Sequence, residues 1–344
     1  MQVIAFEVLL FSQVFGGLPL KYTDGTSSGR VISFSPMVCV WGWTMIALLI
    51  FFSQMTLYVD FQGKLSGNIR MTSHTATFAV VLDVVSLNIM ALVVIVESFR
   101  HHKKFIEMCY LLGKVDHSLR QKLECVDRTK VLLVLSYMTS LTVASLVQEF
   151  CFGSEGRNSF VFYIPVFSLY CVEAALFVQF TTMTQGIAAR FRLINDVMKK
   201  TVISKSFGQL FRNQSFVKIN AIQEDTSCMT NLRDLIGLYW LLCDAVQYAN
   251  VFYGNQLLAA VFSGLVHIII TFYYLFLHLV PGQGSYLVIQ GFWAITHISH
   301  LVLLVRPSTA LTDAIAGSVT TYLVILIQFQ TTPPTPGKVD QRTA

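Results

Sequence analysis

Three polar or aromatic residues that suit a small ligand fall on one side of an apolar stretch near the C-terminus. Gln290, Trp293 and His297 are spaced at i, i+3 and i+7, so a helix places them on one face. An indole can stack on a sugar-like ring, while an amide and an imidazole can hydrogen-bond its hydroxyl groups. The stripe suits a polyhydroxylated ligand, but from these residues alone an ordinary polar helix–helix interface is the favoured interpretation.

Asp83 is an acidic residue within the apolar run Val81–Val85. A charge in such a run is costly and by default marks a site or a water-filled cavity. Two interpretations of Asp83 stay open: contact with a ligand, or a structural carboxyl that is protonated or paired with another helix. Glu173 either neutralises a basic neighbour or touches a ligand. The remaining polar groups of this kind are His267, His278 and His300.

The last apolar segment has polar or aromatic residues at both ends. Thr321 and Tyr322 precede five aliphatic residues, and Gln328 and Phe329 follow them. Lipid or protein would accept the aliphatic residues equally. The amide at the far end favours a wet environment, and the adjacent ring is large enough to block an opening.

Composition identifies an integral membrane protein. The chain is 54% hydrophobic and only 12% charged, with a mean hydropathy of +0.61, whereas a soluble domain is about 25% charged. Its sequence has no His-Glu-x-x-His, no Gly-rich phosphate loop and no Gly-x-Ser-x-Gly, and its seven cysteines lack metal-type spacing. We therefore expect neither an enzyme nor a metal, cofactor or nucleic-acid partner.

The hydrophobic pattern predicts an all-α fold of seven transmembrane helices within residues 35–330. Residues 1–34 form an N-terminal segment that we interpret as an interfacial helix rather than a cleaved signal, and 331–344 form a tail. Helices 4 and 5 are too long for a bilayer and are expected to extend into a cytosolic anchor. The predicted spans are 35–59, 76–98, 131–150, 160–185, 251–279, 285–305 and 311–330.

The positions of the basic residues predict the orientation. Most of the 24 Lys and Arg residues fall between spans 2 and 3 or between spans 4 and 5. Basic loops stay cytosolic, which places the N-terminus inside and the C-terminus outside. The sequon at Asn213 then lies in the cytosol and should carry no glycan.

The chain resembles insect gustatory receptors, and most closely their fructose-responsive branch. The matching stretches begin with Gly29-Arg30-Val31 and Leu82-Asp83-Val84 and continue in spans 4, 5 and 6. The last one is Thr321–Gln330, which resembles the signature that closes the seventh helix of that family. The other matching stretches are Tyr163-Ile164-Pro165, Ser168-Leu169-Tyr170, Leu275-Phe276-Leu277 and Tyr286-Leu287, together with Gln290, Trp293 and His297.

This resemblance implies a ligand-gated, non-selective cation channel in the plasma membrane of sensory neurons, assembled as a homo- or hetero-tetramer. Spans 1 to 6 would enclose an outward-facing sugar pocket, and span 7 would line the pore. The implied ligand-binding residues are Asp83, Tyr170, Gln290, Trp293 and His297. The implied pore and gate residues are Thr321, Tyr322, Gln328 and Phe329.

One departure from the family pattern concerns the connection between spans 6 and 7. The family has a long cytosolic segment there, whereas only Arg306–Ala310 separates the two spans here. A short loop can still join two antiparallel helices. Two alternatives to a working channel therefore stay open: a non-conducting or truncated isoform, and a secondary transporter that uses Asp83 and the span-6 histidines as a proton relay.

Overall fold

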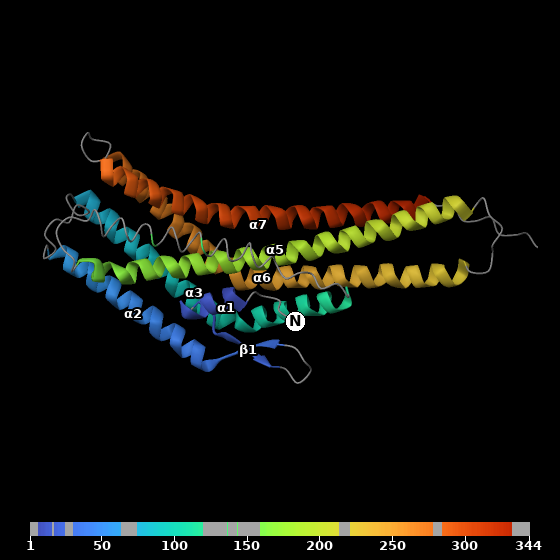
Figure 1. Ribbon diagram of the computed structural model, residues 1–344, viewed down its shortest axis with the longest axis horizontal. Coiled ribbons are helices and arrows are strands. Elements are labelled where there is room, and N and C mark those ends of the chain that lie inside the picture. The colour runs from blue at the N-terminus through green and yellow to red at the C-terminus, as the bar shows by residue number, and fades with distance from the viewer. Residues whose placement is uncertain are drawn as a thin grey trace, which may run out of the picture. The chain divides into compact units, whose positions relative to one another are not determined.

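The computed structural model contains long helices and one short β-hairpin (Figure 1). It describes residues 6–15, 17–24, 30–62, 74–119, 159–212, 221–277 and 284–331, with Ser136 and Val143 as isolated positions. The predicted span at 131–150 lies outside this described part. The helices are α1 (Phe6–Val14), α2 (Pro36–Phe61), α3 (His74–Ser118), α5 (Ser159–Arg212), α6 (Ala221–Leu277) and α7 (Gly284–Thr331), and the strands are β1 (Leu20–Asp24) and β2 (Arg30–Phe34).

Within the described residues, four helical stretches are long and apolar enough to cross a membrane. They are Pro36–Val59, His74–Ser118, Ile164–Lys200 and Arg233–Leu277. Their polarity is the reverse of a soluble protein's. Phe78 and Leu258 are 66% and 70% exposed, whereas the buried Ser53 and Asn88 hydrogen-bond to each other across α2 and α3 at 3.0 Å. Apolar groups outside and polar contacts between helices fit a bundle whose solvent is lipid.

Helix α3 continues about 20 residues past the end predicted for span 2. The sequence prediction stopped at 98 because basic residues follow, but a buried apolar stripe carries the helix onward. Phe105 at the centre of this stripe contacts the rings of Phe252 and Tyr253 on α6, with centroid distances of 4.7 and 6.3 Å. The other members of the stripe are Met108, Cys109, Leu112 and Val115.

The N-terminal segment packs against the rest of the first unit, and its helix α1 is shorter than predicted; its location at the membrane interface stays a prediction. Leu9 of α1 and Leu20 of β1 are 2% and 0% exposed. The Ser12 hydroxyl donates to Gln179 Oε1 of α5 at 3.3 Å. Beyond α1 the chain turns into the antiparallel β1–β2 hairpin, in which Leu20 pairs with Phe34. The sequence analysis did not predict this hairpin.

Residues 306–310, predicted to be a loop between spans 6 and 7, are helical. Helix α7 is continuous from Gly284 to Thr331 and, at 1.5 Å per residue, about 72 Å long. Pro307 lies inside it without ending it, and the hydroxyls of Ser308 and Thr309 bond back to the carbonyls of Leu304 and Val305 at 2.8 and 3.2 Å. Seven spans and the orientation of the termini stay predictions.

The contacts between helices show which way each one runs. Along α3 and α6, Asp83 meets His267 while Ala76 meets Tyr274, so these helices are antiparallel. Contacts of Tyr170 with His267 and of Phe180 with Tyr253 make α5 antiparallel to α6 as well. Helices α3 and α5 therefore run in the same direction although they are successive described helices. A return crossing between them is what the predicted span at 131–150 would supply.

The chain divides into two compact units. The first is Met1–Ile187 with Leu241–Thr309, and the second is Ala188–Trp240 with Ala310–Ala344. In the second unit, Asn195 of α5 donates to the carbonyl of Ala314 on α7 at 3.4 Å. Helices α5 and α6 thus continue beyond the predicted spans 4 and 5, as their sequences indicated. That the second unit is a cytosolic anchor stays a prediction.

Candidate functional site

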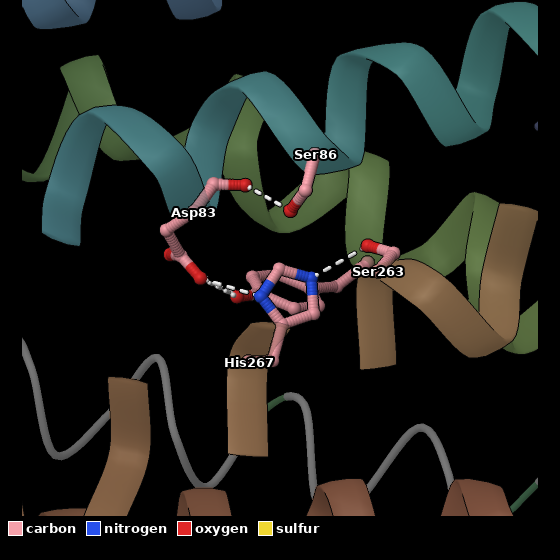
Figure 2. Close-up of polar contacts among 5 residues, drawn as sticks. Asp83, Ser86, Ser263 and His267 are labelled. Atoms are coloured by element: carbon pink, nitrogen blue, oxygen red, sulfur yellow. Dashed lines mark hydrogen bonds and ion pairs between the residues drawn. The ribbon is translucent and has the colours of Figure 1, made fainter. Parts of the chain in front are cut away.

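The centre of the candidate site is a carboxylate–imidazole pair between α3 and α6, within the first unit (Figure 2). Asp83 Oδ1 lies 2.5 Å from His267 Nδ1. The imidazole is fully buried, whereas the Asp83 side chain is 22% exposed. Because Nδ1 faces a carboxylate oxygen, which accepts, we assign the ring proton to Nδ1 as the hydrogen-bond donor. Asp83 is thus paired with another helix, and part of its carboxylate is still exposed.

Ser263 fixes the other nitrogen of the same ring. Its Oγ lies 2.9 Å from His267 Nε2, one helical turn earlier on α6. Ser263 and His267 are spaced i, i+4, which puts both on one face of the helix. Within the partner helix α3, the Ser86 hydroxyl donates to the Asp83 carbonyl at 2.8 Å. The sequence analysis missed Ser263, since a serine within an apolar helix is an ordinary small residue there.

The atom order Ser263–His267–Asp83 is that of a hydrolase triad, but this setting does not activate a nucleophile. Ser263 is 0% exposed and lies within α6, where neighbouring backbone amides donate inside the helix. An acyl-transfer site needs preorganised donors for the oxyanion and access for its substrate. Within the described residues, this triple therefore orients an imidazole.

Tyr170 of α5 completes the pair from a third helix. Its hydroxyl lies 3.4 Å from Asp83 Oδ2 and 3.5 Å from Oδ1. These distances exceed the 2.7–2.8 Å usual for hydroxyl–oxygen bonds, so the contact is weak. The Tyr170 ring also lies 5.1 Å from the His267 ring. The structure buries Tyr170 at 8% exposure beside Asp83.

The aromatic wall of the site comes from α7. Trp293 and His297 stack at 5.7 Å between ring centroids and an interplanar angle of 20°. His297 in turn stacks on His267 at 5.2 Å, and Tyr170 contacts Trp293 at 5.0 Å. Phe167 of α5 stacks on the Trp293 ring at 5.9 Å. Four helices thus bring carboxylate, phenol, indole and imidazole groups into one buried cluster.

Two further polar side chains, Glu173 and His300, are buried beside this cluster. Glu173 is 0% exposed and His300 is 4% exposed. Neither carboxylate oxygen of Glu173 and neither ring nitrogen of His300 has a hydrogen-bond partner among the described residues, and the same holds for Nδ1 of His297. Gly264, next to Ser263, faces Glu173: a Cβ there would lie 4.0 Å from Oε1. Buried polar atoms without partners are rare and costly, which makes them candidates for contact with a ligand.

The structure brings together four of the five predicted ligand-binding residues: Asp83, Tyr170, Trp293 and His297. The fifth, Gln290, is half-buried one turn before Trp293, but within the described part no hydrogen bond or ring contact joins it to the others. The backbone of the predicted pore and gate residues belongs to α7, and their side chains are outside the described part of the structure. These four residues are Thr321, Tyr322, Gln328 and Phe329.

The comparisons with known proteins identify the class of this chain. Residues 8–315 match the family model of the 7tm chemosensory receptors. The chain belongs to this family of membrane receptors, and the expected resemblance to insect gustatory receptors is confirmed.

A curated relative gives a narrower indication. The chain is 23% identical over 328 residues to the "Gustatory receptor for sugar taste 43a" of Drosophila melanogaster, covering 83% of this chain and 76% of that protein. The family match includes every residue of the cluster around Asp83 and ends before Thr321.

Proposed function

We propose that this chain is a gustatory receptor that works as a ligand-gated, non-selective cation channel opened by an extracellular sugar, with fructose as the first ligand to test. The observation that supports it most is the cluster of Asp83, Tyr170, His267, Trp293 and His297, buried in a member of a chemosensory family. The receptor would assemble as a homo- or hetero-tetramer in the plasma membrane of sensory neurons.

The chemistry of the cluster suits a polyhydroxylated ring. Among the described residues, Asp83 Oδ2 has only the long contact with Tyr170, so a ligand hydroxyl can donate to it at little cost. The indole of Trp293 offers a face for the C–H groups of a sugar ring, and Nδ1 of His297 is a polar atom without a partner in the described residues. Binding would draw α3, α5, α6 and α7 around the ligand.

Sugar-evoked current in cells that express this chain alone is the experiment that tests the proposal. Fructose should evoke a cation current in the unaltered chain, and Trp293→Ala should abolish it while surface labelling stays unchanged. A Trp240→Ala variant is the matched control, because that indole is 63% exposed and belongs to the second unit. Currents that survive Trp293→Ala would remove this residue from the site. A surface-resident chain without current would identify a non-conducting subunit.

The gate is the second part of the proposal. We place it at Gln328 and Phe329, with Thr321 and Tyr322 at the start of the same pore-lining segment. Phe329→Ala should raise the basal current of surface-resident channels, since a methyl group closes less of an opening than a phenyl ring. An unchanged leak would contradict the gate.

A secondary transporter is the alternative, and one observation favours it. The imidazoles of His267, His297 and His300 follow one another at centroid distances of 5.2 and 6.4 Å, beginning at Asp83. Proton relays in transporters are built from such groups. Saturable sugar uptake coupled to acidification, without sugar-evoked channel current, would favour the transporter.

A further inference from the structure

The path of α7 through Pro307 depends on a side chain from another helix. Proline has no amide hydrogen, so the carbonyl four residues earlier loses its helical donor, and the ring pushes that carbonyl away from the helix axis. In α7 this carbonyl belongs to Leu303. The Thr181 hydroxyl of α5 donates to the Leu303 oxygen at 2.8 Å. In membrane helices such donors are the means by which an internal proline is tolerated.

This contact continues a seam that begins at the candidate site. Along α5, Tyr170, Phe177 and Thr181 contact α7 at intervals of seven and four residues, which keeps them on one side of the helix. Their partners on α7 are His297, His300 and Leu303, at centroid distances of 5.9 and 5.2 Å for the two ring pairs and 2.8 Å for the hydrogen bond. All of these residues belong to the first unit. A shift of α5 against α7 at the cluster therefore acts directly on the bond at Leu303.

We propose that Thr181 and Leu303 form a latch that keeps α7 continuous at Pro307, and that Thr181 is a positioning residue through which ligand binding controls the bending of α7. The functional half of this inference rests on the proposed channel; the latch itself does not. With the latch closed, α7 continues past Pro307 as one helix. When the bond opens, the Leu303 carbonyl has no donor and the helix bends there.

The chain supplies a matched control one residue away. Thr181 and Thr182 are both 6% exposed, but the Thr182 hydroxyl donates to the carbonyl of Val178 within α5 itself. Threonine to valine replaces a hydroxyl by a methyl group of similar size in both cases. Only Thr181→Val removes the donor to Leu303, because in Thr182→Val the Val178 carbonyl keeps its helical amide donor.

Hydrogen–deuterium exchange of the full-length chain in detergent tests the latch without any channel assay. Thr181→Val should raise the exchange of the amides of residues 308–311 by about tenfold, because a part-buried acceptor left without a donor favours local opening. Thr182→Val should leave it unchanged. In a Pro307→Ala background, the new amide of residue 307 supplies Leu303, so Thr181→Val should lose most of its effect.

Two results would overturn the latch: equal exchange in Thr181→Val and Thr182→Val, or an equal effect of Thr181→Val with and without Pro307. Basal and sugar-evoked currents of the same variants then test the functional half. Thr181→Val should alter them and Thr182→Val should not. If the unaltered chain passes no current, the proposed channel fails while the exchange result still decides the latch. If currents occur and Thr181→Val leaves them unchanged, the coupling is wrong.

Discussion

The two polar regions of the buried cluster differ in how many of their atoms have partners. Around Asp83 the polar atoms are used: the carboxylate meets His267 and Tyr170, and the far side of the imidazole meets Ser263. Around Glu173 and His300 they are not, within the described residues. The first region therefore holds α3, α5 and α6 together, whereas the second adds a desolvation cost to the fold. Buried polar groups without a described hydrogen-bond partner are the ones most readily explained by ligand contact.

Removing the carboxylate of the first region should have the largest effect. Asp83→Ala leaves the buried His267 Nδ1 donor without its partner, and breaking a buried pair in this way costs about 3–5 kcal/mol. Hydrogen bonds between membrane helices average only about 0.6 kcal/mol. Thermal unfolding of the purified protein measures the difference. A loss below about 1 kcal/mol, set against that average, would mean that the pair is an ordinary neutral hydrogen bond.

Substitution in the second region should act in the opposite direction. Glu173→Leu replaces a fully buried carboxyl without described partners by an apolar side chain of similar reach. We expect a gain of about 1–3 kcal/mol in the free energy of unfolding, the usual penalty for an unsatisfied buried group. The sugar response should fall at the same time if Glu173 serves the ligand. Lower stability in Glu173→Leu would show that the carboxyl has a structural partner after all, and the contrast between the two regions would be lost.

Tyr170→Phe should have the smallest effect on stability. The variant keeps the ring, with its contacts to Trp293 and His267, and removes the long hydroxyl contacts with Asp83. A change of about 0.6 kcal/mol or less is expected from such a contact. Its effect on the concentration of sugar that gives half-maximal response should be severalfold, because the hydroxyl lies at the open edge of the carboxylate. A response identical to that of the unaltered chain would restrict Tyr170 to packing.

Helical periodicity predicted which residues share a helix face better than it predicted where helices end. Trp293 and His297 share a face because their spacing requires it. For Asp83, an acidic residue in an apolar run, pairing with another helix was one of the two interpretations. Which partner it found depends on tertiary contact: nothing in the spacing joins Asp83 to His267, 184 positions away. The uninterrupted α7 was missed for the same reason. From the sequence, Pro307 predicts a break in the helix. In the structure, Thr181 of α5 donates to the Leu303 carbonyl, which proline leaves without its helical donor.

Ligand binding at the cluster can be observed directly through the fluorescence of Trp293. The chain has four tryptophans, and Trp41, Trp43 and Trp240 are 49%, 39% and 63% exposed, so their replacement by phenylalanine leaves Trp293 as the single buried reporter. Fructose should then change the emission saturably in the purified receptor, and Asp83→Asn should abolish that change at the same protein concentration. Emission that fructose does not alter, or that it alters equally in Asp83→Asn, would contradict a sugar site built on Asp83 and Trp293.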